Sequence, residues 1–479
     1  MGHENLGMRG AALFQFGSKY ISMGAQVVIT AILARLIAPE DFGLVAIVTV
    51  FTGLFSLLSD MGIGTSIVQY RDLTDEDYGA LFGFSIVFAI CLTAAFCIVS
   101  PLIAIFYDDP RLVMLCCVAS PTLLFSTLNS VPEGLMLKDK RFDLIAVRLV
   151  VATVASGTLA IVLAIIGWGA VALVLQTAMS AAVVLVWNLV SRPIYHVSLH
   201  FMKAIRRIFS YSAYQFGFSL INYFSRNLDN MLVGRFLGNA QLGYYDKAYK
   251  LTSYPMSAFS SVIGSVIQPY MAEHQDDPDV IFVCFMKVEK LLSLVGAGVA
   301  AVFFCASAEI VEVLYGPGWE TSIPVFAVLS ISVYFQMLGN PSGAFFQSLG
   351  RTDYMFRAGL INTSITFAGL FIGLAGGSIL TVAYGIATAY CLHIGSMLYY
   401  LVWKGFGKTP VCMKAFLPEV LISVVAMVAC SIVFLFLDLP VVASLICKMA
   451  LVCAVMLLGY WRADQLKYLK SLLRRKGGK

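Results

Sequence analysis

Apolar blocks of roughly 20 residues recur along the whole chain, and short polar segments separate them. A block of this length crosses the hydrocarbon core of a bilayer as an α-helix. We therefore expect an all-α polytopic membrane protein of about fourteen transmembrane helices. The predicted spans are 11–36, 41–66, 79–106, 112–135, 144–166, 168–191, 209–236, 243–271, 283–306, 321–347, 356–376, 378–403, 416–437 and 440–460.

The composition agrees with this pattern. The 479 residues are 59% hydrophobic and 12% charged, whereas a soluble domain carries about 25% charged residues. None of the eleven cysteines forms a CxxC motif, so we predict no metal site and no disulfide framework. The chain also lacks a P-loop motif, so we expect neither ATP hydrolysis nor a cofactor.

Lysine and arginine residues are distributed unequally between the predicted loops. The side formed by the termini and the even-numbered loops holds 21 of them, and the opposite loops hold Arg35, Arg111 and Arg235. Cytoplasmic loops carry the positive excess. We therefore predict that both termini are cytoplasmic. All five tryptophans lie near predicted span ends, as in an interfacial belt.

The chain contains an internal repeat with an offset of 200 residues. FQFGSKYI at 14–21 aligns with YQFGFSLI at 214–221, and ARLIAPEDFGL at 34–44 aligns with GRFLGNAQLGY at 234–244. Six spans separate the two repeat starts, so both halves share one topology. Such repeats are typical of alternating-access transporters, with the binding cavity between the halves. A duplicated scaffold without transport is the alternative.

These boundaries divide the chain into three parts. We predict an N-terminal lobe at 1–207, a C-terminal lobe at 208–403, and two further spans with a basic cytoplasmic tail at 404–479.

Polar residues inside the first and seventh spans form equivalent stripes. Ionisable groups in the membrane are costly and mark functional sites. Lys19 and Arg226 would make a shared cavity cationic and suited to a phosphate or an acidic sugar. Arg226 and Asp229 could instead pair at i, i+3 and lock packing. The predicted cavity residues on these two spans are Gln15, Lys19, Gln26, Asn222, Arg226, Asp229 and Asn230.

Other charges lie inside or near the spans. Arg148, Lys287 and Lys290 could receive a headgroup phosphate near the cytoplasmic side, or extend to the interface. Asp60 and Asp229 are weak candidates for ion coupling.

Three further local predictions concern helix geometry. We expect Asp246 and Lys250 to form an i, i+4 pair. Pro255, Pro324 and Pro341 should bend their helices.

Several strings resemble a known family. They are GALFQFGSKY, LARLIAPEDFGLVAI, LLSDMGIGTSIVQ and RNLDNMLVGRFLGNAQLGYYDKAYKL, within 10–72 and 208–270. They look like the Wzx-type bacterial polysaccharide flippases, and most closely their lipopolysaccharide, colanic-acid and teichuronic-acid exporter branch. That branch belongs to the multidrug/oligosaccharidyl-lipid/polysaccharide exporter superfamily.

The resemblance implies a MATE-like fold of two six-helix lobes plus two C-terminal helices. It also implies that the cargo is an undecaprenyl-pyrophosphate-linked oligosaccharide, turned from the inner to the outer leaflet of the bacterial cytoplasmic membrane. The expected partners are this lipid-linked oligosaccharide, membrane lipids and a polysaccharide polymerase machinery. We expect a monomer and no nucleic-acid partner.

Two alternatives remain. A multidrug or lipid-II exporter would share the fold, although a cationic cavity disfavours cationic drugs. A membrane enzyme such as a polymerase or a lipid-linked glycosyltransferase needs a catalytic acidic cluster. The acidic clusters, DDPR at 108–111 and DDPD at 276–279, lie in short loops and are more typical of helix caps. We therefore predict that the protein is not an enzyme.

Overall fold

The computed structural model describes residues 8–60, 63–70, 72–198, 201–202, 220, 223–224, 226–272, 277–437 and 439–465, and every regular element in them is a helix. The chain divides into two compact units, Met1–Gly243 and Tyr244–Lys479, and each is described by itself. Twelve helical segments of the described residues are long and apolar enough to cross a membrane. The predicted all-α membrane fold is confirmed, whereas the count of fourteen spans stays a prediction.

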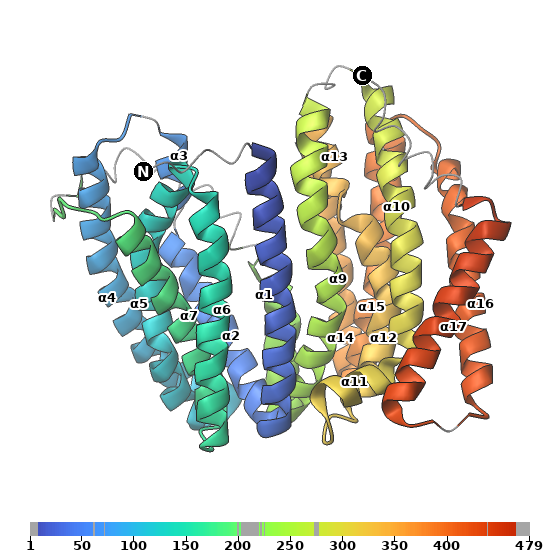
Figure 1. Cartoon of the computed structure of the whole chain (residues 1–479), viewed down its shortest axis with the longest axis horizontal. Coiled ribbons are helices and arrows are strands. Elements are labelled where there is room, and N and C mark those ends of the chain that lie inside the picture. The colour runs from blue at the N-terminus through green and yellow to red at the C-terminus, as the bar shows by residue number, and fades with distance from the viewer. Residues whose placement is uncertain are drawn as a thin grey trace. The chain divides into compact units, whose positions relative to one another are not determined.

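The first unit is built around α5. Its helices are α1 (Met8–Leu36), α2 (Pro39–Asp60), α3 (Ile63–Gln69), α4 (Asp75–Tyr107), α5 (Arg111–Lys138), α6 (Phe142–Ile165) and α7 (Ala170–Ser191), and residues 226–237 are also helical. Helix α5 packs against α2, α3, α4 and α7, while α6 packs against α1 and α7 (Figure 1). The interior between α1, α5, α6 and α7 is where the polar residues of this unit gather.

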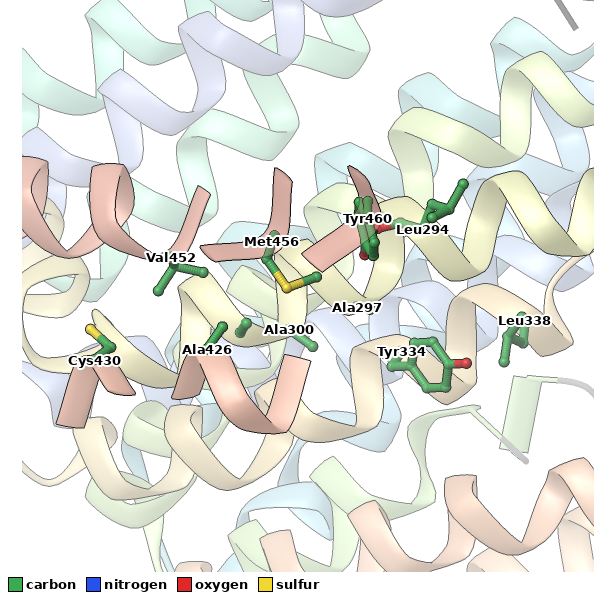
Figure 2. Close-up of a cluster of buried hydrophobic side chains, with 11 residues drawn as sticks. Leu294, Ala297, Ala300, Tyr334, Leu338, Ala426, Cys430, Val452, Met456 and Tyr460 are labelled. Carbon is green, nitrogen blue, oxygen red and sulfur yellow. The ribbon is translucent and has the colours of Figure 1, made fainter. Parts of the chain in front are cut away.

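The second unit is built around α10. Its helices are α9 (Asn239–Ala272), which begins in the first unit, and α10 (Pro278–Cys305), α11 (Ser307–Tyr315), α12 (Ser322–Gly339), α13 (Ser342–Ser348), α14 (Thr352–Ala375), α15 (Ile379–Met397), η1 (Leu398–Gly405), η2 (Pro410–Phe416), α16 (Leu417–Phe434) and α17 (Val441–Arg462). Figure 2 shows residues of α12, α16 and α17 around Ala297 and Ala300 of α10. Apolar lipid gives no hydrophobic drive for helix association, so membrane helices depend on close packing. Small residues permit that packing because their side chains take little space.

The acidic clusters cap helices, as their loop positions predict. Asp277 is the N-cap of α10, and its side chain accepts hydrogen bonds from the backbone N–H groups of Asp279 and Val280. Asp108 ends α4 in the left-handed conformation with φ 57°. The neighbouring Asp109 accepts hydrogen bonds from the backbone and guanidinium N–H groups of Arg111. The hydrogen bonds from Arg111 outweigh burial and lower the pKa of this loop carboxyl below its usual value.

Some local predictions need correction. Pro341 does separate α12 from α13, but Pro324 lies in the first turn of α12, where its missing N–H has no helical partner to lose. Helix α9 continues through Pro255, and the bend predicted there stays a prediction. Trp319 does not belong to an interfacial belt, because it is fully buried against Tyr244 and Tyr315. The sequence reading also missed α11.

The 200-residue repeat is visible where the first turns of two equivalent helices meet, within the first unit. Helix α2 begins at Pro39 and α9 at Asn239, 200 positions apart. A Cβ atom at Gly43 would collide with the carbonyl oxygen of Asn239, and a Cβ atom at Gly243 would collide with that of Pro39. The contact is therefore reciprocal, as expected of a pseudo-symmetric pair.

Candidate functional site

Hydroxyl and amide side chains line an open cavity of the first unit. Its volume is about 490 Å³. Four helices supply the lining: Gln26 from α1; Thr122, Ser126 and Asn129 from α5; Thr153 and Ser156 from α6; and Gln176, Thr177, Ser180, Ala181 and Val184 from α7. We call this the polar chamber. Nine of these eleven lining residues are polar and uncharged. Polar groups are costly among membrane-spanning helices, so such a concentration marks a candidate functional site.

The hydroxyl groups of the polar chamber are oriented by their own helices. Thr153 donates to the Leu149 carbonyl at 2.8 Å, and Thr177 donates to the Val174 carbonyl at 2.7 Å. Ser156 donates to the Thr153 carbonyl at 3.3 Å. A hydroxyl has one hydrogen to donate and two lone pairs that accept. These oxygens therefore keep acceptor capacity for the O–H groups of a ligand.

A charged network adjoins the polar chamber through Asn129. Arg148 on α6 binds Glu133 on α5 with both terminal nitrogens, at 2.5 and 3.1 Å, and also donates to the Asn188 side chain at 2.6 Å. Asn188 on α7 donates in turn to Asn129 at 2.8 Å and to Glu133 at 2.9 Å. Arg148 as a whole residue is 7% exposed. The positive charge of Arg148 is balanced by the carboxylate of Glu133. Because the bonded residues come from α5, α6 and α7, the network joins these three helices.

The predicted residues of the first unit fall into different environments. Gln26 lines the polar chamber. Gln15 and Lys19 are half-buried on α1. Asp229 and Asn230 are half-buried, Arg226 is exposed, and the Asp229 carboxylate accepts the backbone N–H of Asn230 at 2.9 Å. Asn222 and the side chain of Asp60 lie outside the described residues.

The predicted lysines of the second unit also differ from one another. Lys290 on α10 lies 2.5 Å from the Glu419 carboxylate of α16 and donates to the Ala415 carbonyl at 2.6 Å. Lys287 is half-buried on the same helix. The predicted pair of Asp246 and Lys250 is confirmed at 2.8 Å.

Helices α14 and α15 carry a second polar group in this unit. The Thr366 hydroxyl lies 3.1 Å from His393 Nε2, and Ser396 donates to the Asn362 side chain at 2.6 Å. The Tyr249 and Tyr390 hydroxyls lie 2.9 Å apart, which joins α9 to α15. Each unit thus contains polar side chains on consecutive helices.

The sequence held an unused signal for the polar chamber. Thr122, Ser126 and Asn129 follow the same i, i+4, i+7 spacing that selected the stripe on the first span. These side chains carry no charge, so the rarity of charged residues in a membrane span does not single them out.

Residues 32–324 match the model of a family described as "Polysaccharide biosynthesis protein". The chain is 26% identical over 402 residues to the teichuronic acid biosynthesis protein TuaB of Bacillus subtilis, covering 81% of this chain and 82% of the relative. It is 26% identical over 388 residues to the lipopolysaccharide biosynthesis protein WzxC of Escherichia coli, covering 80% and 78%.

Among solved structures, the inward closed conformation of the lipid II flippase MurJ is similar, with a TM-score of 0.77. The superposition covers 95% of this chain and 99% of the other at 12% sequence identity. At that identity the likeness concerns the fold alone.

Proposed function

Because the chain belongs to the polysaccharide biosynthesis protein family, we propose that it is a flippase for undecaprenyl-pyrophosphate-linked oligosaccharide repeat units. Family membership confirms the resemblance identified from the sequence. The chain is a multi-pass protein of the bacterial inner membrane with the fold of a flippase. The nature of the lipid-linked cargo is our proposal.

The polar chamber is the observation that carries this proposal. Sugars present many O–H groups and no charge, so they suit a cavity of hydroxyl and amide side chains. A cavity of about 490 Å³ holds part of a repeat unit. The lipid tail would stay in the bilayer, against the exposed apolar side chains of the helices.

Lys19 and Arg226 are our proposed ligands of the pyrophosphate. Charge-assisted hydrogen bonds to phosphate oxygens are shorter and stronger than neutral ones. Gln15, Asn222, Asp229 and Asn230 would extend this surface. The two units would alternate between access from the cytoplasm and access from the opposite side.

We assign Arg148 and Lys290 a different role from the one first predicted. Each is already paired with a buried or half-buried carboxylate, so an incoming phosphate would have to break that pair. We propose that both residues hold helices together, and that Lys287 stays a candidate headgroup ligand. Asp60 and Asp229 stay candidates for ion coupling.

The competing functions fit less well. A multidrug exporter for cations would gain nothing from Lys19 and Arg226, the two cations that we propose as ligands. Lipid II also carries a pyrophosphate-linked sugar, so that alternative differs only in the glycan. The acidic clusters that an enzyme would need are helix caps here.

Export of surface polysaccharide tests the proposal. We expect Lys19→Ala and Arg226→Ala each to reduce export about tenfold or more, because a hydrogen bond to a charged group contributes about 1.5–3 kcal/mol. Lys140→Ala, in an exposed turn, is the matched control and should export normally. Normal export by both cavity variants, at unchanged membrane levels, would refute the role of these cations.

A further inference from the structure

Glu289 is a carboxyl group enclosed in the middle of a membrane-spanning helix. It lies in α10, which runs from Pro278 to Cys305, and its exposed fraction is 0%. Neither of its side-chain oxygens has a hydrogen-bond partner among the described residues. An isolated ionised carboxylate is so costly to bury that such a group takes up a proton instead.

The surroundings of Glu289 are apolar on one side and weakly polar on the other. Phe285, one turn before it, contacts Phe345 of α13 with ring centroids 5.0 Å apart. Ser293, one turn after it, shares a 3.0 Å hydrogen bond with the Tyr334 hydroxyl of α12. Residues i−4 and i+4 lie on the same helix face. Glu289 therefore faces the packing between α10 and the α12–α13 segment.

The ionisable groups on the packed helices are already engaged. Lys290 pairs with Glu419 of α16, and Lys448 of α17 pairs with Glu309 of α11 at 2.5 Å. Tyr460 of α17 donates to the Leu294 carbonyl, and Figure 2 shows both residues with Tyr334 in the same cluster. Lys287 and Lys290 sit two and one positions from Glu289, and such neighbours do not face each other on a helix. α13 contributes no ionisable side chain.

We propose that Glu289 is a proton-binding site of the second unit. The carboxylic acid keeps its proton while α10 packs closely on α12. When these helices separate enough to admit water, the O–H bond breaks, the proton passes to water, and the carboxylate is stabilised by hydration. Protonation is thereby linked to the conformation of the unit. The use of this link to drive flipping rests on the proposed function, whereas the bound proton does not.

Infrared spectroscopy of the purified protein tests the bound proton directly. A buried carboxylic acid gives a carbonyl stretching band at neutral pH, and Glu289→Gln should remove that band. Glutamine resembles the neutral acid in size and hydrogen bonding, so we expect this variant to fold. Glu320→Gln is the control, because this loop carboxylate is exposed and accepts the Gly318 N–H. A spectrum unchanged by Glu289→Gln would overturn the proposal.

A second experiment tests the link to transport. Proteoliposomes would carry a fluorescent undecaprenyl-pyrophosphate-linked monosaccharide, with and without a gradient of one pH unit. We expect the gradient to change the distribution of the probe by up to about tenfold for one proton in the wild type, and not at all in Glu289→Gln. A gradient response retained by Glu289→Gln, or absent from the wild type, would overturn the coupling. Failure of the wild type to move the probe even without a gradient would refute the proposed function, and the infrared band would still decide whether Glu289 holds a proton.

Discussion

Arg148 illustrates how one buried charge depends on its partners. Its guanidinium binds Glu133 twice and Asn188 once, inside a unit of membrane-spanning helices. Removing one member of a buried pair leaves the other charge uncompensated, which costs about 3–5 kcal/mol. Replacing both members by neutral groups avoids that cost. The network should therefore tolerate a double change better than a single one.

We predict that Arg148→Met lowers the thermal stability of the detergent-purified protein markedly. Adding Glu133→Gln to that variant should recover most of the loss, because no unpaired carboxylate remains beside Asn129 and Asn188. Unfolding followed by tryptophan fluorescence measures both effects. If the double variant is as unstable as Arg148→Met, the guanidinium acts by filling space and not by balancing charge.

At the scale of helices, much of the fold followed from apolar block length and from caps. The predicted span 112–135 corresponds to Arg111–Lys138, and 440–460 corresponds to Val441–Arg462. The missed helix α11 is nine residues long, too short for a block pattern to indicate. The interfacial position predicted for Trp319 was wrong, because a location near a span end does not show whether other residues, here Tyr244 and Tyr315, bury the side chain.

The site was less predictable than the fold, for a physical reason. Lys19 and Arg226 stand out in an apolar sequence because a charge is rare there. Ser126 and Thr153 do not stand out, since a hydroxyl group can donate its hydrogen bond to a backbone carbonyl of its own helix and is therefore tolerated in a membrane span. Only the packing of α1, α5, α6 and α7 shows that these hydroxyls face a common cavity. That Glu289 has no hydrogen-bond partner among the described residues likewise depends on how α10 packs against α12 and α13.

The close approach of the first turns of α2 and α9 gives a prediction at the element scale. Alanine at Gly43 or Gly243 would place a methyl group against a backbone carbonyl, and backbone cannot move aside as a flexible side chain does. We expect each substitution to destabilise the protein by about 1–3 kcal/mol. The fraction that elutes as folded monodisperse protein in size-exclusion chromatography reports this loss.

Gly24→Ala on α1 is the matched control. No atom lies within 4 Å of a Cβ at that position, and alanine favours a helix over glycine by about 0.8–1.0 kcal/mol. This variant should fold at least as well as the wild type. Equal yields from Gly24→Ala and Gly43→Ala would mean that the two helices do not approach closely in the membrane.

At the scale of the whole molecule, the two units differ in the polar groups that they hold. The reciprocal glycine contact preserves the repeat. The first unit has an open polar chamber beside the mutually neutralised Arg148–Glu133 pair, whereas the second unit buries Glu289, which has no hydrogen-bond partner among the described residues. Under the proposed function, the polar chamber suits sugar recognition and Glu289 suits energy coupling.

The same charge pattern gives a prediction for the orientation of the molecule in the membrane. The loops and tail that hold 21 lysines and arginines should remain cytoplasmic, since translocating a positive segment opposes the positive-inside preference. A green fluorescent protein fused after Lys479 should therefore fluoresce, and alkaline phosphatase at that point should be inactive. Alkaline phosphatase fused after Leu437, between α16 and α17, should be active because one span separates the two sites. Phosphatase activity at both positions would mean that α17 does not cross the bilayer, and activity after Lys479 alone would mean that the whole topology is inverted.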